Sequence, residues 1–212
     1  MLFTSQIYSF CAAVLLMSFL FFVASAQTLP NDEVEALQEI ATRLGKTDWK
    51  FGADSCNTTG SGGNNSITCD CHNTVCHVVA IDLSRNYLNG SLPPEWGLSR
   101  LTNITLLGNR LTGTIPKEFG NITTLLELLL DHNQLSGPVP PEIGNLPAIE
   151  RMRISDLNGT EQTFPPLRGM KSIKRLVLRN CNIIGQLPEY LVDMKNLTTL
   201  LVEPFLILLL MI

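Results

Sequence analysis

One repeated unit recurs along residues 78–204, and this repetition limits the possible folds more than any other feature of the sequence. Each unit follows the pattern L-x-x-L-x-L-x-x-N-x-L-x-G-x-I-P. The Asn position of the pattern falls at positions 86, 109, 133, 157 and 181, so the unit length is nearly constant. A sixth unit begins at Leu197 and departs from the pattern at Phe205. About five similar units in one register predict a stack of repeats.

Each part of the unit has a physical role. The L-x-L alternation predicts a short strand with both leucines pointing inward. The Asn side chain is expected to bond backbone groups where the chain leaves the strand, and Gly-x-Ile-Pro permits a turn and then an extended return. The pattern is typical of leucine-rich repeats and predicts a solenoid with a short parallel β-sheet on its concave face. A helical repeat built on the same leucines is the weaker alternative.

Residues 1–26 predict a secretory signal peptide. Residues 10–23 are predominantly apolar, and Ala24-Ser25-Ala26 provides a small-residue cleavage site before Gln27. Residues 1–9 contain no Lys or Arg, which departs from the usual signal. An uncleaved anchor is the alternative, although the apolar run is short for a membrane span.

Residues 27–77 predict an N-terminal cap for the solenoid. A helix can begin with Asn31 as its N-cap and end at Gly45. One face of this helix is apolar and contains Val34, Leu37, Ile40, Ala41 and Leu44. We expect this face to cover the open core of the first repeat, and a partner-binding amphipathic helix is the alternative.

Four cysteines, Cys56, Cys69, Cys71 and Cys76, lie just before the repeats. In a secreted protein such a cluster predicts disulfides. The first expectation is Cys56–Cys69 with Cys71–Cys76, and the second is Cys56–Cys71 with Cys69–Cys76. A metal site that includes His72 and His77 is the rival prediction, but the C-x-C spacing differs from that of the usual zinc knuckle, so we expect no metal.

Asn-x-Ser/Thr sequons also indicate secretion. Seven of them in so short a chain favour a glycosylated extracellular protein. The predicted N-glycosylation sites are Asn57, Asn64, Asn89, Asn103, Asn121, Asn158 and Asn196. Secretion to the extracellular space is therefore the expected localisation.

Composition and motifs exclude several classes of function. The formal net charge of −4 gives no polybasic case for a nucleic-acid partner. The sequence contains no G-x-G-x-x-G loop, no H-R-D or D-F-G triplet and no Gly-x-Ser-x-Gly elbow. We therefore expect neither enzymatic activity nor a cofactor, and a binding surface is what remains.

Strand alternation identifies the side chains that face outward from the concave sheet. The candidate ligand-binding residues are Arg151, Arg153, Arg175, Arg179, Leu129, Asp131 and His132. Neighbours in one column lie about 4.8 Å apart, so Arg151 and Arg175 should be adjacent like charges. One hypothesis is an anion-preferring surface for an acidic peptide or a cell-wall carbohydrate. The alternative is a face neutralised by its own acidic residues, Glu127, Asp131, Glu150 and Asp156.

Several sequence segments of the cap and of the repeats resemble those of a known family. The segments LGKTDWKFGADSC, CDCHNTVCHVVAI, DLSRNYLNGSLPPEWG and RISDLNGTEQTFPPL resemble plant leucine-rich repeat receptor-like serine/threonine kinases, in the group with a malectin-like ectodomain. The resemblance implies plant-type L-x-G-x-I-P repeats, a plasma-membrane receptor, and a peptide, a carbohydrate or another receptor ectodomain as partner.

The sequence also departs from that family. The resemblance implies more repeats, a malectin-like domain, a membrane span and a kinase, and this sequence lacks these parts. Residues 205–212 are an aberrant apolar tail. The expected function is therefore the recognition module of such a receptor, shortened, and signalling only through a longer form or a partner. A secreted defence-type enzyme inhibitor and a non-functional truncated fragment are the alternatives.

Overall fold

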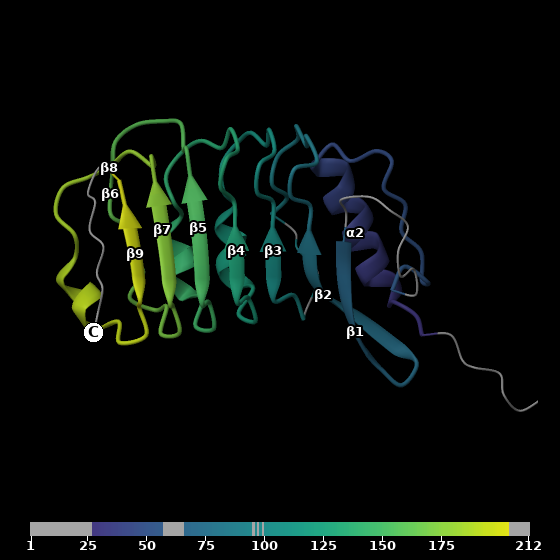
Figure 1. Ribbon diagram of the computed structural model, residues 1–212. Helices are drawn as coiled ribbons and strands as arrows, with labels where there is room; N and C mark the ends of the chain where they lie inside the picture. Colours follow the sequence, from purple (N-terminus) through teal and green to yellow (C-terminus); the bar gives the residue numbers. More distant parts are fainter. Residues whose placement is uncertain (1–26, 57–65, 95, 97, 99, 204–212) are drawn as a thin grey trace, which may run out of the picture.

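The computed structural model describes residues 27–56, 66–94, 96, 98 and 100–203. The predicted signal peptide (1–26), the tail (205–212) and the sequons at Asn57 and Asn64 lie outside these residues. The described chain forms a single row of stacked units with the helix α2 at one end (Figure 1).

A seven-stranded sheet runs along the whole row (Figure 1). Its strands, in spatial order, are β1 (Ser66–His72), β2 (Val75–Asp82), β3 (Asn103–Thr105), β4 (Glu127–Leu129), β5 (Arg151–Ser155), β7 (Arg175–Arg179) and β9 (Thr199–Val202). β1 pairs with β2 in an antiparallel hairpin, and every later neighbouring pair is parallel. The parallel sheet expected from the repeat is confirmed.

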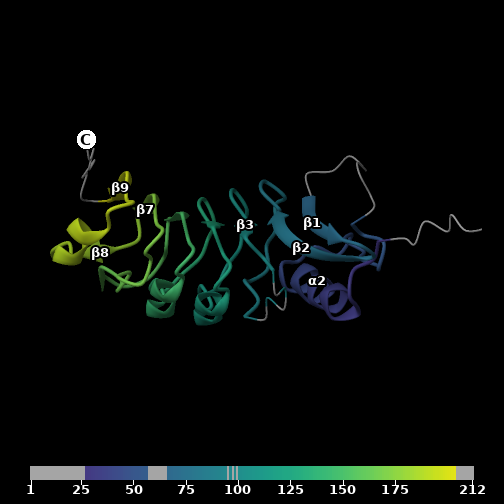
Figure 2. The same ribbon diagram turned by 90° about the horizontal axis from the view of Figure 1, so that it is seen from below.

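Three short 3-10 helices, η1 (Lys117–Asn121), η2 (Pro141–Asn145) and η3 (Glu189–Asp193), lie on the side opposite the sheet (Figure 2). Each helix follows a proline with extended backbone. The expected extended return is therefore only partly correct, because the extension ends at the proline and a helical turn follows. Two further strands, β6 (Gln162–Thr163) and β8 (Ile183–Ile184), form a separate parallel pair.

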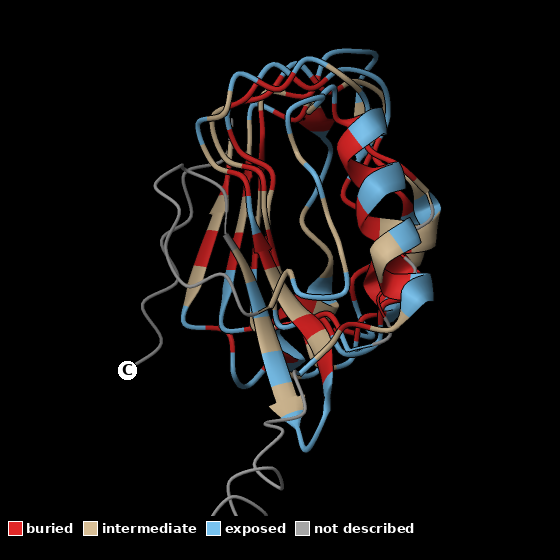
Figure 3. Cartoon of the chain, turned by 90° about the vertical axis from the view of Figure 1, so that its right-hand side faces the viewer, coloured by how far each residue is buried: buried red, intermediate tan, exposed pale blue. Residues whose placement is uncertain are grey.

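Between the sheet and the opposite side, the apolar residues of all units form one continuous core (Figure 3). In the third unit Leu125, Leu128 and Leu130 are each 0% exposed, as the inward positions of the pattern require. Burying a side chain of this size contributes about 1.5–3 kcal/mol to the free energy of folding. The repeated leucines therefore stabilise every unit of the row.

The Asn positions form a ladder of side-chain hydrogen bonds beneath the sheet. The Asn109 side-chain oxygen accepts hydrogen bonds from the backbone N–H groups of Asn86 (2.9 Å) and Leu88 (3.0 Å). Its side-chain NH₂ donates to the carbonyl oxygens of Leu83 (2.9 Å) and Leu106 (3.0 Å). One side chain thus joins two neighbouring units, which confirms the role expected for this position.

Two units lack this asparagine. Leu157 fills the position with a buried apolar side chain. Cys181 fills it with a buried thiol whose sulfur lies 3.5 Å from the carbonyl oxygen of Ile154 and 3.3 Å from that of Arg179. Burial raises the pKa of the Cys181 thiol to about 12, so this cysteine behaves as a small core residue.

The cap helix α2 spans Asn31–Arg43. Asn31 was expected to be its N-cap, but the N-cap is Pro30, and no side chain of the described residues caps the helix. At the other end Gly45 has φ +75° and donates its N–H to Thr42, as a helix stop requires. The inward residues Leu37, Ile40 and Leu44 are buried against the core. None of the described helices has the length and apolar character needed to cross a membrane.

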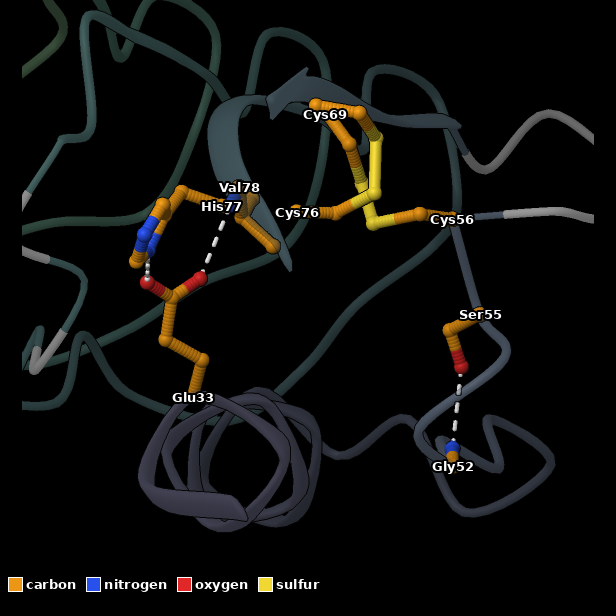
Figure 4. Close-up of a disulfide and its surroundings, with 9 residues drawn as sticks. Glu33, Gly52, Ser55, Cys56, Cys69, Cys76, His77 and Val78 are labelled. Carbon is orange, nitrogen blue, oxygen red and sulfur yellow. Dashed lines mark hydrogen bonds and ion pairs between the residues drawn. A yellow bond between two sulfur atoms is a disulfide. The ribbon is translucent and has the colours of Figure 1, made fainter. Parts of the chain in front are cut away.

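The cysteines hold the β1–β2 hairpin and the segment before it together. Cys56 is bonded to Cys69 (Figure 4). Cys71 is bonded to Cys76, and together these are the first of the two expected pairings. Strand β1 itself was not predicted from the sequence. The rival metal site does not fit, because all four sulfurs are in disulfides and the His77 ring contacts Glu33.

Candidate ligand-binding surface

The solvent-facing side of the sheet, here called the sheet face, presents side chains in columns. Asn103 is paired with Glu127, Glu127 with Arg151, Arg151 with Arg175, and Arg175 with Thr199. A second column contains Thr105, Leu129, Arg153, Val177 and Leu201. The adjacency of Arg151 and Arg175 that the repeat spacing predicted is confirmed. Leu129 was expected to face outward and is half-buried between Thr105 and Arg153, its neighbours in the column.

Two ion pairs join neighbouring units near the N-terminal ends of the parallel strands. Nη1 of Arg151 lies 2.6 Å from Oε2 of Glu127, and Nζ of Lys174 lies 2.7 Å from Oε2 of Glu150. In both pairs the basic residue follows the acidic one by the length of one unit. The repeat therefore places opposite charges at equivalent or nearly equivalent positions of neighbouring units.

Arg153 is paired with Asp131, and this pair corrects one expectation. Asp131 was expected to face the ligand, but it is 1% exposed and lies beneath Arg153. Nε of Arg153 lies 2.9 Å from Oδ2 of Asp131 without forming an aligned hydrogen bond, and both atoms are buried. Burial raises the pKa of the Asp131 carboxyl above its usual value, although Arg153 opposes this shift.

Asp156 is the centre of a polar cluster at the other end of the strands. Its carboxylate accepts hydrogen bonds from Oγ of Ser155 (2.6 Å) and Nδ2 of Asn180 (3.1 Å). Nη2 of Arg179 lies 3.9 Å away and Nδ1 of the exposed His132 lies 3.6 Å away. The hydrogen bond from Ser155, with help from Asn180 and Arg179, lowers the pKa of Asp156 below its usual value.

Arg175 differs from the other four basic residues of this surface. Arg151, Arg153, Arg179 and Lys174 each have an acidic partner, and the partners are the four proposed for a self-neutralised face. The exposed Arg175 has no carboxylate partner among the residues that the structure describes. Of the two hypotheses, self-neutralisation therefore accounts for most of the surface, and the anionic-ligand hypothesis is confined to the neighbourhood of Arg175.

The predicted sequons within the described residues differ in exposure. Asn89, Asn121, Asn158 and Asn196 are exposed, whereas Asn103 is half-buried in strand β3. Asn103 lies on the sheet face next to Glu127 and accepts a hydrogen bond from Thr102 (2.7 Å). A glycan on Asn103 would project over the sheet face, so its occupancy bears directly on the function.

One polar contact was missed by the sequence analysis. Glu33 was not expected to make a contact, yet this residue is 2% exposed and its carboxylate contacts both His77 and Val78 (Figure 4). A charged residue on the apolar side of the helix, one turn before Leu37, was the available signal. This contact positions the cap and lies away from the sheet face.

Comparisons with known proteins agree with this architecture. The family model described as Leucine Rich Repeat matches residues 100–122, 124–146 and 172–194. A probable leucine-rich repeat receptor-like serine/threonine-protein kinase of Arabidopsis thaliana is 38% identical over an alignment of 161 residues, and the match covers 59% of this chain. The chain spans only 16% of the length of that relative.

Solved structures show the same fold. The ectodomain of the receptor kinase SOBIR1 from Arabidopsis thaliana superposes with a TM-score of 0.63 at 22% identity, covering 81% of this chain and 91% of that one. The plant peptide hormone receptor RGFR1 in complex with RGF2 superposes with a TM-score of 0.52 at 30% identity, covering 57% and 20%. This chain is a leucine-rich repeat solenoid with a disulfide-bonded cap, and it is similar to the ectodomain region of plant leucine-rich repeat receptor-like kinases.

Proposed function

We propose that this chain is an extracellular recognition module that binds a peptide, a carbohydrate or another receptor ectodomain through its sheet face. Recognition is reversible and involves no bond making or breaking. A signal would pass through a kinase that a longer form or a partner protein carries. The protein would act in the apoplast, where its disulfides are stable.

The observation that carries the proposal is the column arrangement of the sheet face. Parallel pairing aligns one residue of each repeat with the equivalent residue of the next, about 4.8 Å away. The columns combine charged side chains with the half-buried Leu129 and Val177. Such a combination of fixed polar groups and apolar area suits an extended ligand lying across several strands. The relative RGFR1, crystallised with RGF2, is described as a peptide hormone receptor, which supports a peptide as ligand.

Direct binding measurements test the proposal. The protein, secreted from plant cells, would be titrated against synthetic peptides, cell-wall oligosaccharides and purified receptor ectodomains. For any ligand found, Leu129→Arg and Val177→Arg should each weaken binding by about tenfold or more, because each places a large charged group in the middle of the sheet face.

Lys117→Gln is the matched control, because Lys117 is exposed on η1 on the opposite side of the molecule (Figure 2). Its affinity should equal that of the unchanged protein, and all variants should melt cooperatively. Full affinity in both folded sheet-face variants would contradict the proposal.

A further inference from the structure

A cavity of about 390 Å³ opens on the sheet face near the start of the parallel strands. Five charged side chains line it, and they are Glu127, Glu150, Arg151, Lys174 and Arg175. Leu126, which is 40% exposed, supplies an apolar part of the lining. The five charges sum to +1, since two are negative and three are positive.

Both carboxylates of the cavity already form ion pairs with basic residues of its lining. The Glu127 carboxylate lies 2.6 Å from Arg151, and the Glu150 carboxylate lies 2.7 Å from Lys174. Each pair joins residues that are one unit apart, so the pairing follows the repeat. The excess positive charge of the cavity is therefore that of Arg175.

The repeat also explains why Arg175 has no carboxylate partner among the described residues. The positions one unit before and one unit after it are Arg151 and Thr199, and both are its direct neighbours in the sheet. Arg151 repels a second guanidinium, and the Thr199 hydroxyl carries no charge. Neither neighbouring strand can neutralise Arg175 in the way that β4 neutralises Arg151.

We propose that Arg175 binds a carboxylate of an acidic peptide ligand that lies across the sheet face. A guanidinium offers a planar fork of N–H donors that matches a carboxylate with two parallel hydrogen bonds. One ligand carboxylate brings the charge of the cavity to zero. It would neutralise Arg175 as Glu127 neutralises Arg151 and Glu150 neutralises Lys174. This inference rests on the proposed function, because it identifies the ligand chemistry at the same surface.

The rest of the lining favours a peptide as the carrier of that carboxylate. Leu126 offers apolar contact beside the charge, and none of the described lining residues is aromatic. A glutamate or aspartate next to an apolar residue presents both kinds of group within the reach of one cavity. Short peptides with one acidic residue are therefore the probes of choice.

The experiment uses three synthetic libraries of short peptides that are identical except for a central Glu, Gln or Lys. The folded, secreted protein should retain the Glu library about tenfold better than the Gln library, and the Lys library least. Arg175→Gln should remove this preference, and Arg175→Lys should keep part of it because the charge remains. Lys117→Gln, which removes a charge from the opposite side, should leave the preference unchanged.

The outcomes separate this inference from the proposed function. If the peptides bind equally well with Glu or Gln, and Leu129→Arg still abolishes binding, the sheet face is a binding surface and the role of Arg175 is wrong. If the Glu preference persists in Arg175→Gln, the carboxylate binds elsewhere and the inference is overturned. If no library binds, neither the inference nor a peptide-binding function stands.

Discussion

The carboxylate of Glu33 joins the cap helix to the first repeat. Its Oε1 lies 2.6 Å from Nδ1 of His77, and its Oε2 accepts a 2.8 Å hydrogen bond from the backbone N–H of Val78 (Figure 4). The two contacts fix α2 to β2, which lies far along the chain from the helix. The carboxylate is nearly inaccessible, so its loss leaves a buried backbone donor without an acceptor.

Glu33→Ala should therefore lower the free energy of unfolding by about 2 kcal/mol, the typical effect of leaving a buried N–H unpaired. Urea denaturation followed by circular dichroism measures this change. Glu35→Ala on the exposed side of the same helix is the control and should change stability by less than about 0.5 kcal/mol. Equal stability of the two variants would show that the Glu33 contacts do not support the cap.

Asn109→Ala should destabilise the solenoid by about 3 kcal/mol, because the Asn109 side chain satisfies two backbone N–H groups and two carbonyl oxygens. Denaturant titration of the variant gives the value. Asn145→Ala provides a comparison of the same chemistry, since Asn145 is exposed on η2. A small effect at Asn109 would mean that water replaces its hydrogen bonds.

The Cys181 thiol should not react with iodoacetamide in the folded protein. It is buried, and a pKa of about 12 leaves only ~10⁻⁴ of it as thiolate at pH 8. Peptide mapping by mass spectrometry should find the Cys181 peptide unmodified in buffer and fully modified in guanidinium chloride with the disulfides intact. Rapid labelling of the native protein would place the thiol at the surface instead.

The carboxylates of Asp131 and Asp156 should give opposite pH dependences of stability. The folded-state pKa of Asp131 is raised above the unfolded value of 3.8, so folding retains a proton there. Its contribution is greatest below pH 3.8 and is lost as the pH rises through the folded-state pKa. The folded-state pKa of Asp156 is lowered below 3.8, so its contribution is present above pH 3.8 and is lost as the pH falls.

Asp131→Asn and Asp156→Asn separate the two effects. Unfolding free energies would be measured from about pH 3 to about pH 7 for the unchanged protein and for both variants. Relative to the unchanged protein, Asp131→Asn should become less destabilising or more stabilising as the pH rises from 3.8, whereas Asp156→Asn should become less destabilising as the pH falls below 3.8. Parallel curves for both variants would contradict these pKa directions.

The repeat predicted the parts of the fold in which equivalent positions of successive units lie side by side. Because the units keep a nearly constant length, the alignment of Arg151 with Arg175 and the buried positions of the leucines followed directly from counting. The same counting failed for Asp131. Strand β4 ends at Leu129, so side-chain alternation no longer applies two positions later.

Two features that depend on contacts between non-equivalent residues were not predicted. The Glu33–His77 contact and the pairing of β1 with β2 involve residues that no periodicity relates. The pairing of Arg153 with Asp131 and of Arg179 with Asp156 was also hidden, because the two members of each pair do not occupy equivalent positions of the repeat. The distance and orientation between two side chains decide whether they contact each other, and residue spacing in the sequence does not give either.

The bonds that join neighbouring units have a consequence for how such a chain can change over generations. Asn109 and the Glu127–Arg151 pair both connect one unit to the next. Duplicating or deleting a whole unit would bring equivalent groups back into register, so the flanking units could bond again without rearrangement. Adding a single residue inside a strand would displace every lateral partner at once. Genetic change in this protein should therefore be tolerated in whole units within the row and as single residues only in loops, such as the one before β6.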